Sequence, residues 1–296
     1  MELAFNLRHD LLPIFQEAKA AGQTMGEGLG RSVLARHRFA RMWGLGDRKN
    51  PQAYTPALIL LEGDPEVDAT LAPFTSTSTT AIPSTLTLNG RLPLCPPNFE
   101  TIGPSYEVSV GHVLPPSLEE ADAGEAAGTS QLLPVSWQRL NHDDSLMDPE
   151  LLPDVVVLVD ALQLAAQPGR LVEAITVLKR RFPGALLWTP GLGGPDNVAL
   201  LTWFGVDLFD LSRSRQAAAA GVLLTAQGPR HCVPTMGEDA SMDKQVQHWE
   251  SSIAEVRAAM VSDQMRALVD RQSPVSNRLF QIMACVEPQI SNFPQL

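Results

Sequence analysis

The chain has 296 residues, of which 44% are hydrophobic and 19% are charged, and this is the composition of a globular protein rather than of a disordered one. Its formal net charge of −11 excludes a surface that binds a polyanion over its whole extent, but it leaves room for a local basic patch. The three cysteines lie far apart in the sequence, which excludes a disulfide scaffold and a zinc site built from four cysteines.

The first half of the chain, residues 1–150, is interrupted by Pro, Gly, Ser and Thr, so few of its elements are clear. The most basic segment, 31–41, is either a solvated face or a patch that contacts phosphates. In chain order, a short helix is predicted over 11–21, a short apolar strand over 57–61, and further strands over 106–114 and 132–140.

Residues 151–275 alternate continuous apolar runs with amphipathic segments. A continuous apolar run of strand length is typical of a strand that is buried on both faces of a parallel sheet. The predicted elements are a strand over 154–162, a helix from about Pro168 to Arg181, a strand over 185–190, a helix over 196–204 and a strand over 206–211. Strands that alternate with helices form parallel βαβ units, so this half predicts an α/β barrel or a doubly wound sheet.

Two further segments of the second half stand out. The glycine-rich loop 191–197 matches neither the dinucleotide-binding motif nor the P-loop, so it is either a tight turn or a place where a flat ligand approaches the backbone. Apolar residues in 243–270 recur at spacings of three and four, which predicts an amphipathic helix packed on its own domain. A second short helix is expected to carry Met265, Leu268 and Val269.

The carboxylates give the clearest chemical signal. Asp207 and Asp210 are three residues apart on one predicted strand, so they point to opposite faces of the sheet. Asp160 lies near the end of an earlier strand. Carboxylates at neighbouring strand ends can serve as nucleophile and as base-recognising group, or one of them can cap a loop. The sequence has no G-x-S-x-G motif and no spacing of ligands that indicates a metal site.

The segment 186–228 contains the run GVDLFD, from Gly205 to Asp210, after a strand, a glycine-containing loop and a helix. In this layout it resembles the tRNA-guanine transglycosylase superfamily, and most of all its archaeosine-synthase-like branch. The resemblance implies a (β/α)8 TIM barrel with a C-terminal helical segment. We therefore expect a barrel over 1–240 and helices over 241–296 that pack on it.

The resemblance also implies the chemistry. In that family a carboxylate attacks the ribose C1′ of a guanosine in tRNA, guanine leaves, and a 7-deazaguanine base replaces it. The family's nucleophile corresponds to Asp210. Substrate contacts are expected from Asp160, Ala161, Leu162, Gly193 and Gly194, and contacts to the nucleic acid from Arg213 and Arg215. Neither a metal nor a cofactor is expected.

The chain departs from the family in lacking its D-S-G-G-F-Q segment, which carries the second catalytic Asp, and its C-x-C-x-x-C zinc cluster. Three interpretations stay open: an active transglycosylase-like enzyme, a non-catalytic partner subunit or binding module, and a barrel enzyme for an unrelated small substrate. The expected partners are tRNA or another nucleic acid, guanine or a 7-deazaguanine, and a second copy or a catalytic homologue. Charges interrupt the apolar N-terminal run and no stretch reaches about 18 apolar residues, so we expect a soluble, cytoplasmic protein without a membrane span.

Overall fold

The computed structural model describes most of the second half of the chain and several strands of the first. The described residues are 30–46, 49–61, 63–77, 85–88, 92–94, 132–149, 151–233 and 239–272. The helix predicted over 11–21 and the strand predicted over 106–114 lie outside them.

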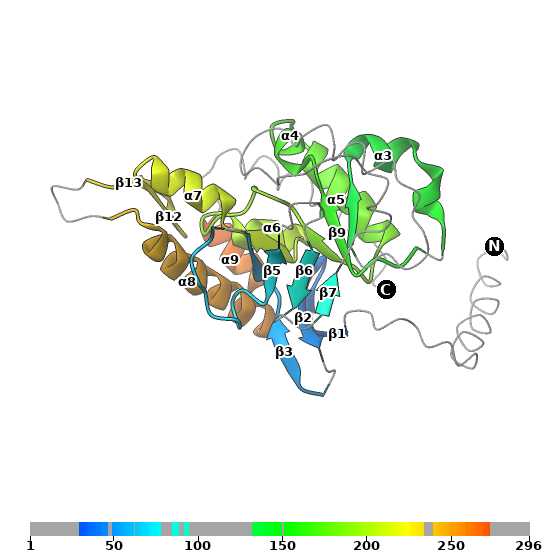
Figure 1. Ribbon diagram of the computed structural model, residues 1–296, viewed down its shortest axis with the longest axis horizontal. Helices are drawn as coiled ribbons and strands as arrows, with labels where there is room; N and C mark the ends of the chain where they lie inside the picture. The colour runs from blue at the N-terminus through cyan, green and yellow to red at the C-terminus, as the bar shows by residue number, and fades with distance from the viewer. Residues whose placement is uncertain are drawn as a thin grey trace.

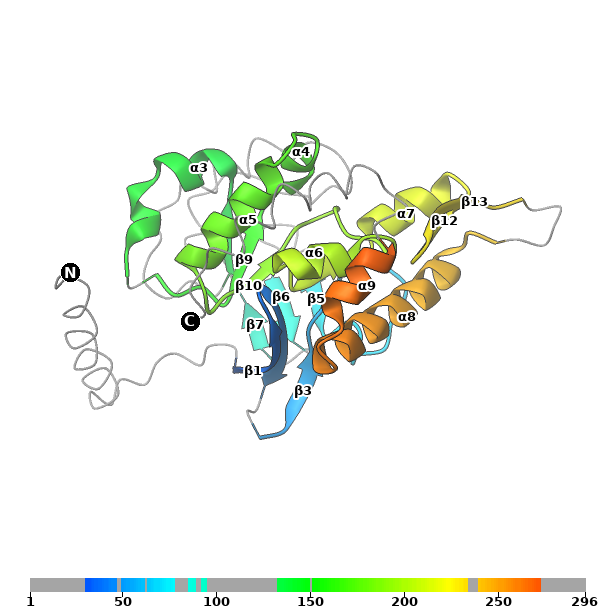
Figure 2. The same ribbon diagram turned by 180° about the vertical axis from the view of Figure 1, so that it is seen from behind.

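A sheet of eight strands runs through the middle of the described structure (Figures 1 and 2). In spatial order its strands are β7 (Leu92–Leu94), β6 (Thr85–Leu88), β5 (Phe74–Thr77), β4 (Ala57–Leu60), β11 (Leu208–Asp210), β10 (Leu186–Trp188), β9 (Val155–Leu158) and β8 (Leu132–Val135). Neighbours from β5 to β8 in this order are parallel, whereas β6 and β7 pair antiparallel. The predicted parallel α/β arrangement is confirmed, and β4, from early in the chain, lies directly beside β11.

Both faces of the parallel strands are buried, which explains why their sequences are continuously apolar instead of alternating. Side chains such as Ile59 and Trp188 pack together on one face of the sheet. Their neighbours Leu58 and Leu187 point to the other face, where helices cover them. The sheet therefore separates two apolar layers, and the polar side chains gather at the ends of its strands.

The helices follow the strands along the chain. They are α3 (Trp137–His142), α4 (Ala161–Ala165), α5 (Arg170–Arg181), α6 (Val198–Phe204), α7 (Ser212–Ala219), α8 (Met242–Val261) and α9 (Met265–Gln272), with a short 3-10 turn over Asp144–Met147. In both views α7 and α8 lie at one end of the sheet, beside the hairpin of β12 (Val222–Thr225) and β13 (Gly228–His231), and α3, α4 and α5 lie at the other end (Figures 1 and 2). No helix among the described residues is long and apolar enough to span a membrane.

Three predicted boundaries are corrected by the local backbone. The strand predicted over 154–162 ends at Leu158, and Ala161 begins helix α4. The strand expected over 132–140 ends at Val135, because the Ser136 side chain accepts a hydrogen bond from the Arg139 N–H and caps helix α3. Helix α5 begins at Arg170 and not near Pro168, because Gly169 takes a left-handed conformation (φ +77°) at the N-cap. Helix α6 ends, as predicted, at Gly205, whose φ of +104° favours glycine.

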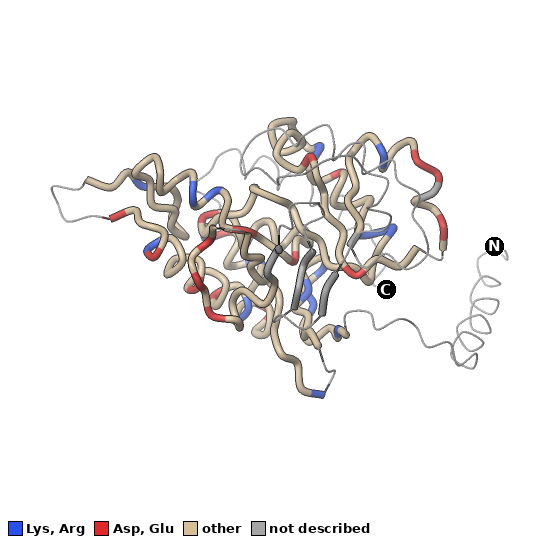
Figure 3. Tube along the Cα trace, in the orientation of Figure 1, with Lys and Arg blue, Asp and Glu red and all other residues tan. Residues whose placement is uncertain are grey.

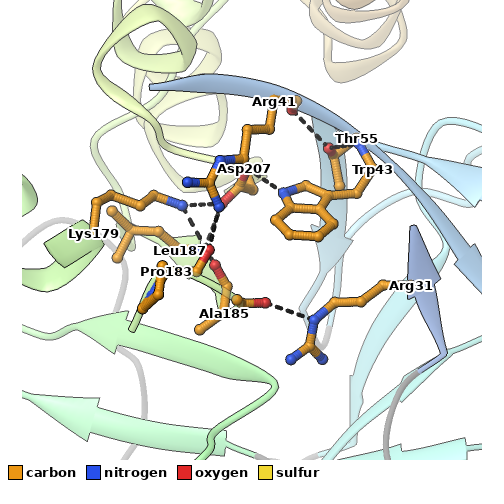
Figure 4. A network of polar contacts seen from close by, with 10 residues as sticks. Arg31, Arg41, Trp43, Thr55, Lys179, Pro183, Ala185, Leu187 and Asp207 are labelled. Atoms are coloured by element: carbon orange, nitrogen blue, oxygen red, sulfur yellow. Dashed lines mark hydrogen bonds and ion pairs between the residues drawn. The ribbon is translucent and has the colours of Figure 1, made fainter. Parts of the chain in front are cut away.

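The basic segment 31–41 lies in a small antiparallel sheet of β1 (Arg31–His37), β2 (Ala40–Gly46) and β3 (Pro51–Tyr54). This sheet packs at the amino ends of the parallel strands. Arg31 forms an ion pair with Asp154, just before β9. Arg41 donates to the carbonyl of Pro183, which precedes β10 (Figure 4). These two basic side chains therefore bind the protein itself and hold its two sheets together.

Candidate active site

The carboxyl ends of the parallel strands lie at the edge of the sheet opposite the small antiparallel sheet. Asp210 ends β11. The strand lies between β4, where Ile59 is in register with Asp210, and β10, where Trp188 is in register with Leu208. The chain segments that leave β4, β10 and β9 carry Asp64, the glycine-rich loop 191–197 and Asp160. Parallel strands present their carboxyl ends together, so one edge gathers three carboxylates from non-adjacent segments.

Asp210 is buried at this edge, with 1% of its surface exposed. Its Oδ2 accepts hydrogen bonds from Trp188 Nε1 at 3.0 Å and from the Gly191 N–H at 2.9 Å, and its Oδ1 accepts one from the Ser212 N–H at 3.0 Å. Three N–H donors suit a charged carboxylate and fix its orientation. Asp210 thus caps the loops after β10 and β11. Loop capping was one of the two roles that the sequence allowed for these carboxylates, and catalysis was the other.

Asp207 lies just before β11, at the end of the strand opposite Asp210. Its Oδ2 lies 2.5 Å from Lys179 Nζ, in a buried ion pair, and accepts a hydrogen bond from the Leu187 N–H at 2.8 Å. Trp43 Nε1 donates to its Oδ1 at 3.2 Å (Figure 4). Asp207 is therefore part of the packing between helix α5 and the small sheet, at the amino end of β11.

Asp160 follows β9 and is joined to the neighbouring strand. Its Oδ2 accepts a hydrogen bond from the Trp137 N–H at 2.8 Å, which ties the start of α3 to the start of α4. Ala161 and Leu162 are the first residues of α4, and Ala161 is buried. Since β10 lies between β9 and β11, Asp160 and Asp210 are separated by two strand spacings, roughly 10 Å, so they do not form a contacting pair.

The predicted glycines of the loop serve its packing. A Cβ at Gly193 would lie 2.5 Å from Phe209 Cδ1 and 3.2 Å from Trp249, and a Cβ at Gly194 would collide with Arg213. The loop also supplies the N–H of Gly191 to Asp210. Glycine at 193 is therefore required for the close approach of the loop to β11 and α8, whereas a Cβ at Gly194 would first meet the movable side-chain ends of Arg213 and Asp196.

Both predicted arginines face carboxylates. Arg213 donates two hydrogen bonds to Asp196, from Nη1 to Oδ1 at 2.5 Å and from Nη2 to Oδ2 at 2.7 Å, which is a bidentate pair. Arg215 Nη1 lies 2.9 Å from Oδ1 of Asp64. Both side chains are partly exposed, at 29% and 24%. Figure 3 shows Lys and Arg positions distributed over several elements, with acidic positions between them.

Sequence reasoning missed Asp64. Its side chain is fully buried, and its Oδ2 accepts a hydrogen bond from the Leu61 N–H at 2.7 Å. Burial raises the pKa of the Asp64 carboxyl above its ordinary value and the nearby charge of Asp210 adds to this, while the Leu61 N–H and Arg215 act in the opposite direction. The signal that pointed to Asp160, a carboxylate just after a predicted buried strand, was also present after the strand predicted over 57–61.

The described residues contain no group of three or more His, Cys, Asp or Glu side chains arranged to hold a metal ion. The site is thus built from carboxylates, two arginines, the Trp188 indole and backbone N–H groups.

Comparison with known proteins gives one informative similarity. No family model matches the chain. A stretch of 76 residues is 34% identical to archaeosine synthase subunit alpha from Methanosarcina acetivorans. The match is partial. It covers 25% of this chain and 12% of that protein, so the chain spans about an eighth of the relative it matches. The similarity agrees with the transglycosylase-like resemblance that the sequence suggested, and it does so over a quarter of the chain.

Proposed function

We propose that the protein is a tRNA-guanine transglycosylase-like base-exchange enzyme in which Asp210 attacks the ribose C1′ of a guanosine. The observation that carries the proposal is the position of Asp210, at the carboxyl end of β11 and oriented by three N–H donors. The surrounding sequence GVDLFD and the similarity to a subunit of archaeosine synthase agree with this chemistry.

The order of the strands supports a (β/α)8 barrel as the scaffold. In such a barrel strands follow one another around the axis and the last strand closes onto the first. Strands β8, β9, β10 and β11 are neighbours in chain order, and β11 then pairs with β4, which pairs with β5. Going around the sheet, β8, β9, β10, β11, β4 and β5 would be six neighbouring strands of a barrel. In that barrel β4 would be the first strand of the chain and β11 the last, and the two would meet where the barrel closes. The chain between β5 and β8 is described only at β6 and β7.

In the proposed reaction the carboxylate of Asp210 bonds to C1′ as the bond from C1′ to guanine breaks, and an incoming 7-deazaguanine reverses these steps. Asp160 and the adjoining Ala161 and Leu162 would contact the base, since the separation of roughly 10 Å from Asp210 leaves room for a flat ring system between them. The loop at Gly193 and Gly194 would form the wall of this site. Arg213 would contact the nucleic acid by exchanging its carboxylate partner for a phosphate, and Arg215 would add a phosphate contact while its Nη1 stays beside Asp64.

A non-catalytic partner subunit is the second candidate. Asp210 is already engaged in capping two loops, both arginines are paired with carboxylates, and the net charge is −11. The protein that the chain resembles is itself named as a subunit. On this interpretation the fold would bind a catalytic homologue or a second copy and would carry out no turnover.

Exchange of radiolabelled guanine into bulk tRNA tests the proposal. The wild-type protein should incorporate label and form an adduct with tRNA that survives a denaturing gel. Asp210→Asn should reduce both by about 10³-fold or more, because the amide is not a nucleophile. Asp68→Asn, an exposed carboxylate outside the site, is the matched control and should behave as wild type.

Folded wild-type protein that neither incorporates label nor forms an adduct would overturn the enzymatic proposal. Affinity capture of a catalytic transglycosylase homologue by the folded protein would then establish the partner-subunit candidate. Failure of that capture would leave both candidates contradicted.

A further inference from the structure

The end of β4 brings a second buried carboxyl group to the site of Asp210. We propose that Asp64 is the proton donor and acceptor of the base exchange, acting beside Asp210 on the neighbouring strand. The inference rests on the proposed function and gives this chain the second acid that its sequence lacks at the family's usual position.

Asp64 follows the strand that lies directly beside the strand of Asp210. Strands β4 and β11 are direct neighbours, one spacing of about 4.8 Å apart, whereas Asp160 is two spacings from Asp210. After β4 the chain turns back, with the Asp64 N–H donating to the Leu61 carbonyl at 3.0 Å and the Leu61 N–H donating to Asp64 Oδ2. This turn holds the carboxyl over the strand end, close enough for the charge of Asp210 to act on it.

Two carboxyl groups at the ends of neighbouring strands fit a double displacement. Enzymes that retain the configuration at an anomeric carbon place the nucleophile and the acid–base carboxyl about 5 Å apart. A base exchange through a covalent intermediate is also a double displacement at C1′. Asp64 follows β4, the direct neighbour of β11, and lies close enough to Asp210 for its charge to act on it, whereas Asp160 follows a strand two positions away and suits contact with the base instead.

The environment of Asp64 favours a carboxyl that carries its proton. The side chain is fully buried. Among the described residues no donor reaches its Oδ1 with hydrogen-bond geometry, although Arg215 Nη1 lies 2.9 Å away. The Arg215 ion pair and the Leu61 N–H favour the carboxylate, but burial and the nearby charge of Asp210 outweigh them, so the pKa of the Asp64 carboxyl is raised. Arg215, on the first turns of α7, then stabilises the carboxylate that remains after proton transfer.

Each half of the exchange forms one bond at C1′ as another breaks. An oxygen of Asp210 bonds to C1′ while the bond from C1′ to N9 breaks, and the electron pair stays on the base. The Asp64 carboxyl gives its proton to the base, which leaves as neutral guanine. In the second half, the Asp64 carboxylate takes the N9 proton of the incoming 7-deazaguanine, whose electron pair attacks C1′ and releases Asp210.

Single-turnover adduct formation with tRNA, followed across pH, tests this role. The wild-type rate should fall as pH rises, because only protonated Asp64 donates. Asp64→Asn should slow adduct formation by about 10²–10⁴-fold, and its rate should no longer decrease as pH rises. In Arg215→Gln the decrease in rate should occur at higher pH, since the variant lacks a charge that favours the Asp64 carboxylate. Asp68→Asn should follow the wild-type profile.

Failure of the Asp64 role and failure of the proposed function give different results in this assay. An Asp64→Asn variant that forms the adduct at the wild-type rate overturns the role of Asp64 and leaves Asp210 as nucleophile. A wild-type protein that forms no adduct overturns the proposed function and the proton transfer with it.

Stability measured across pH examines the carboxyl independently of activity. A carboxyl with a raised pKa binds more protons in the folded than in the unfolded state, so its contribution to stability is present at low pH and lost as pH rises through the folded pKa. Relative to Asp64→Asn, the wild type should therefore lose stability between pH 3.8, the ordinary value, and neutrality. Asp68, whose pKa is lowered by hydrogen bonds from Thr70, should give the opposite sign. Parallel curves for wild type and Asp64→Asn would overturn the proposal.

Discussion

Lys179 and Asp207 form the most deeply buried ion pair that the structure describes, with 2% and 1% of their side chains exposed. Burial lowers the pKa of the Lys179 ammonium, and the charge and hydrogen bond of Asp207 oppose this shift. Lys179 also donates to the Ala185 carbonyl, while Asp207 accepts from Leu187 and Trp43 (Figure 4). The pair is therefore a polar network fixed on several sides, not a surface contact.

Lys179→Met removes the only cation of this pair and leaves a buried carboxylate, so we expect the free energy of unfolding to fall by about 3–5 kcal/mol. Urea denaturation of the variant and the wild type measures the difference. Lys244→Met, at an exposed lysine of α8, is the matched control and should stay within about 0.5 kcal/mol of wild type. A loss of the same size in both variants would contradict the assignment of the cost to the buried pair.

The carboxylates show how far single residues can be interpreted from the sequence. The strand period predicts opposite faces for Asp207 and Asp210; in the structure they lie at opposite ends of β11, where Asp207 pairs with Lys179 just before the strand and Asp210 ends it. The partners of Arg213 and Arg215 could not be predicted, because Asp196 and Asp64 lie on loops that are brought to α7 by the pairing of strands distant in the sequence. The same limit applies to Trp188, whose indole reaches Asp210 from the neighbouring strand.

At the scale of elements, the loop between β10 and α6 is shaped by contacts on both of its sides. Gly193 lies against Phe209 of β11 and Trp249 of α8, at distances that leave no space for a methyl group. The same loop carries the Gly191 N–H that binds Asp210. The position of the loop is therefore coupled to the orientation of the proposed nucleophile.

Gly193→Ala should destabilise the protein by about 1–3 kcal/mol, because a methyl group is forced into a packed site. It should also lower adduct formation by shifting the Gly191 N–H away from Asp210. Gly184→Ala is the control, since a Cβ there meets nothing closer than 3.9 Å. Thermal unfolding and the adduct assay measure the two effects. Equal behaviour of the two alanine variants would show that the loop tolerates the methyl group.

The elements that the sequence predicted well are those in which periodicity and burial agree. Four continuous apolar runs became parallel strands, because strands buried on both faces need no alternation. The small sheet of β1, β2 and β3 was not predicted. Its first strand has mixed exposure and its pairing contains a register shift, so neither a period of two nor an apolar run marks it. The strand predicted over 132–140 was too long because the cap at Ser136 starts a helix.

For the whole molecule, the pairing of β4 with β11 is the feature that the sequence left undetermined. The alternation of strands and helices predicts parallel units, but it does not state which strands become neighbours when they are about 150 residues apart in the chain. That pairing brings Asp64 to Asp210. The first and last parallel strands therefore depend on each other for the site, and contacts that hold them together should affect the entire fold.

Arg257 of α8 is one such contact. Its Nη2 donates to the carbonyls of Tyr54, Pro56 and Thr70, at 2.6, 2.9 and 3.2 Å, and so connects the late helix to the segments on both sides of β4. Burial lowers the pKa of its guanidinium to about 10, so it stays charged at neutral pH. The helix thus binds the start of the parallel sheet through one charged side chain.

Arg257→Met should lower the free energy of unfolding by about 2–4 kcal/mol, because three carbonyls lose a charged donor and a methionine fills only the apolar part of the space. If β4, β11 and α8 form one cooperative unit, circular dichroism and the fluorescence of the five tryptophans should still report a single, coincident transition in the variant. Arg266→Met, at a more exposed arginine of α9, should cost less than about 0.5 kcal/mol. Two separate transitions in Arg257→Met would show instead that the C-terminal helices unfold on their own and that the first and last strands do not depend on them.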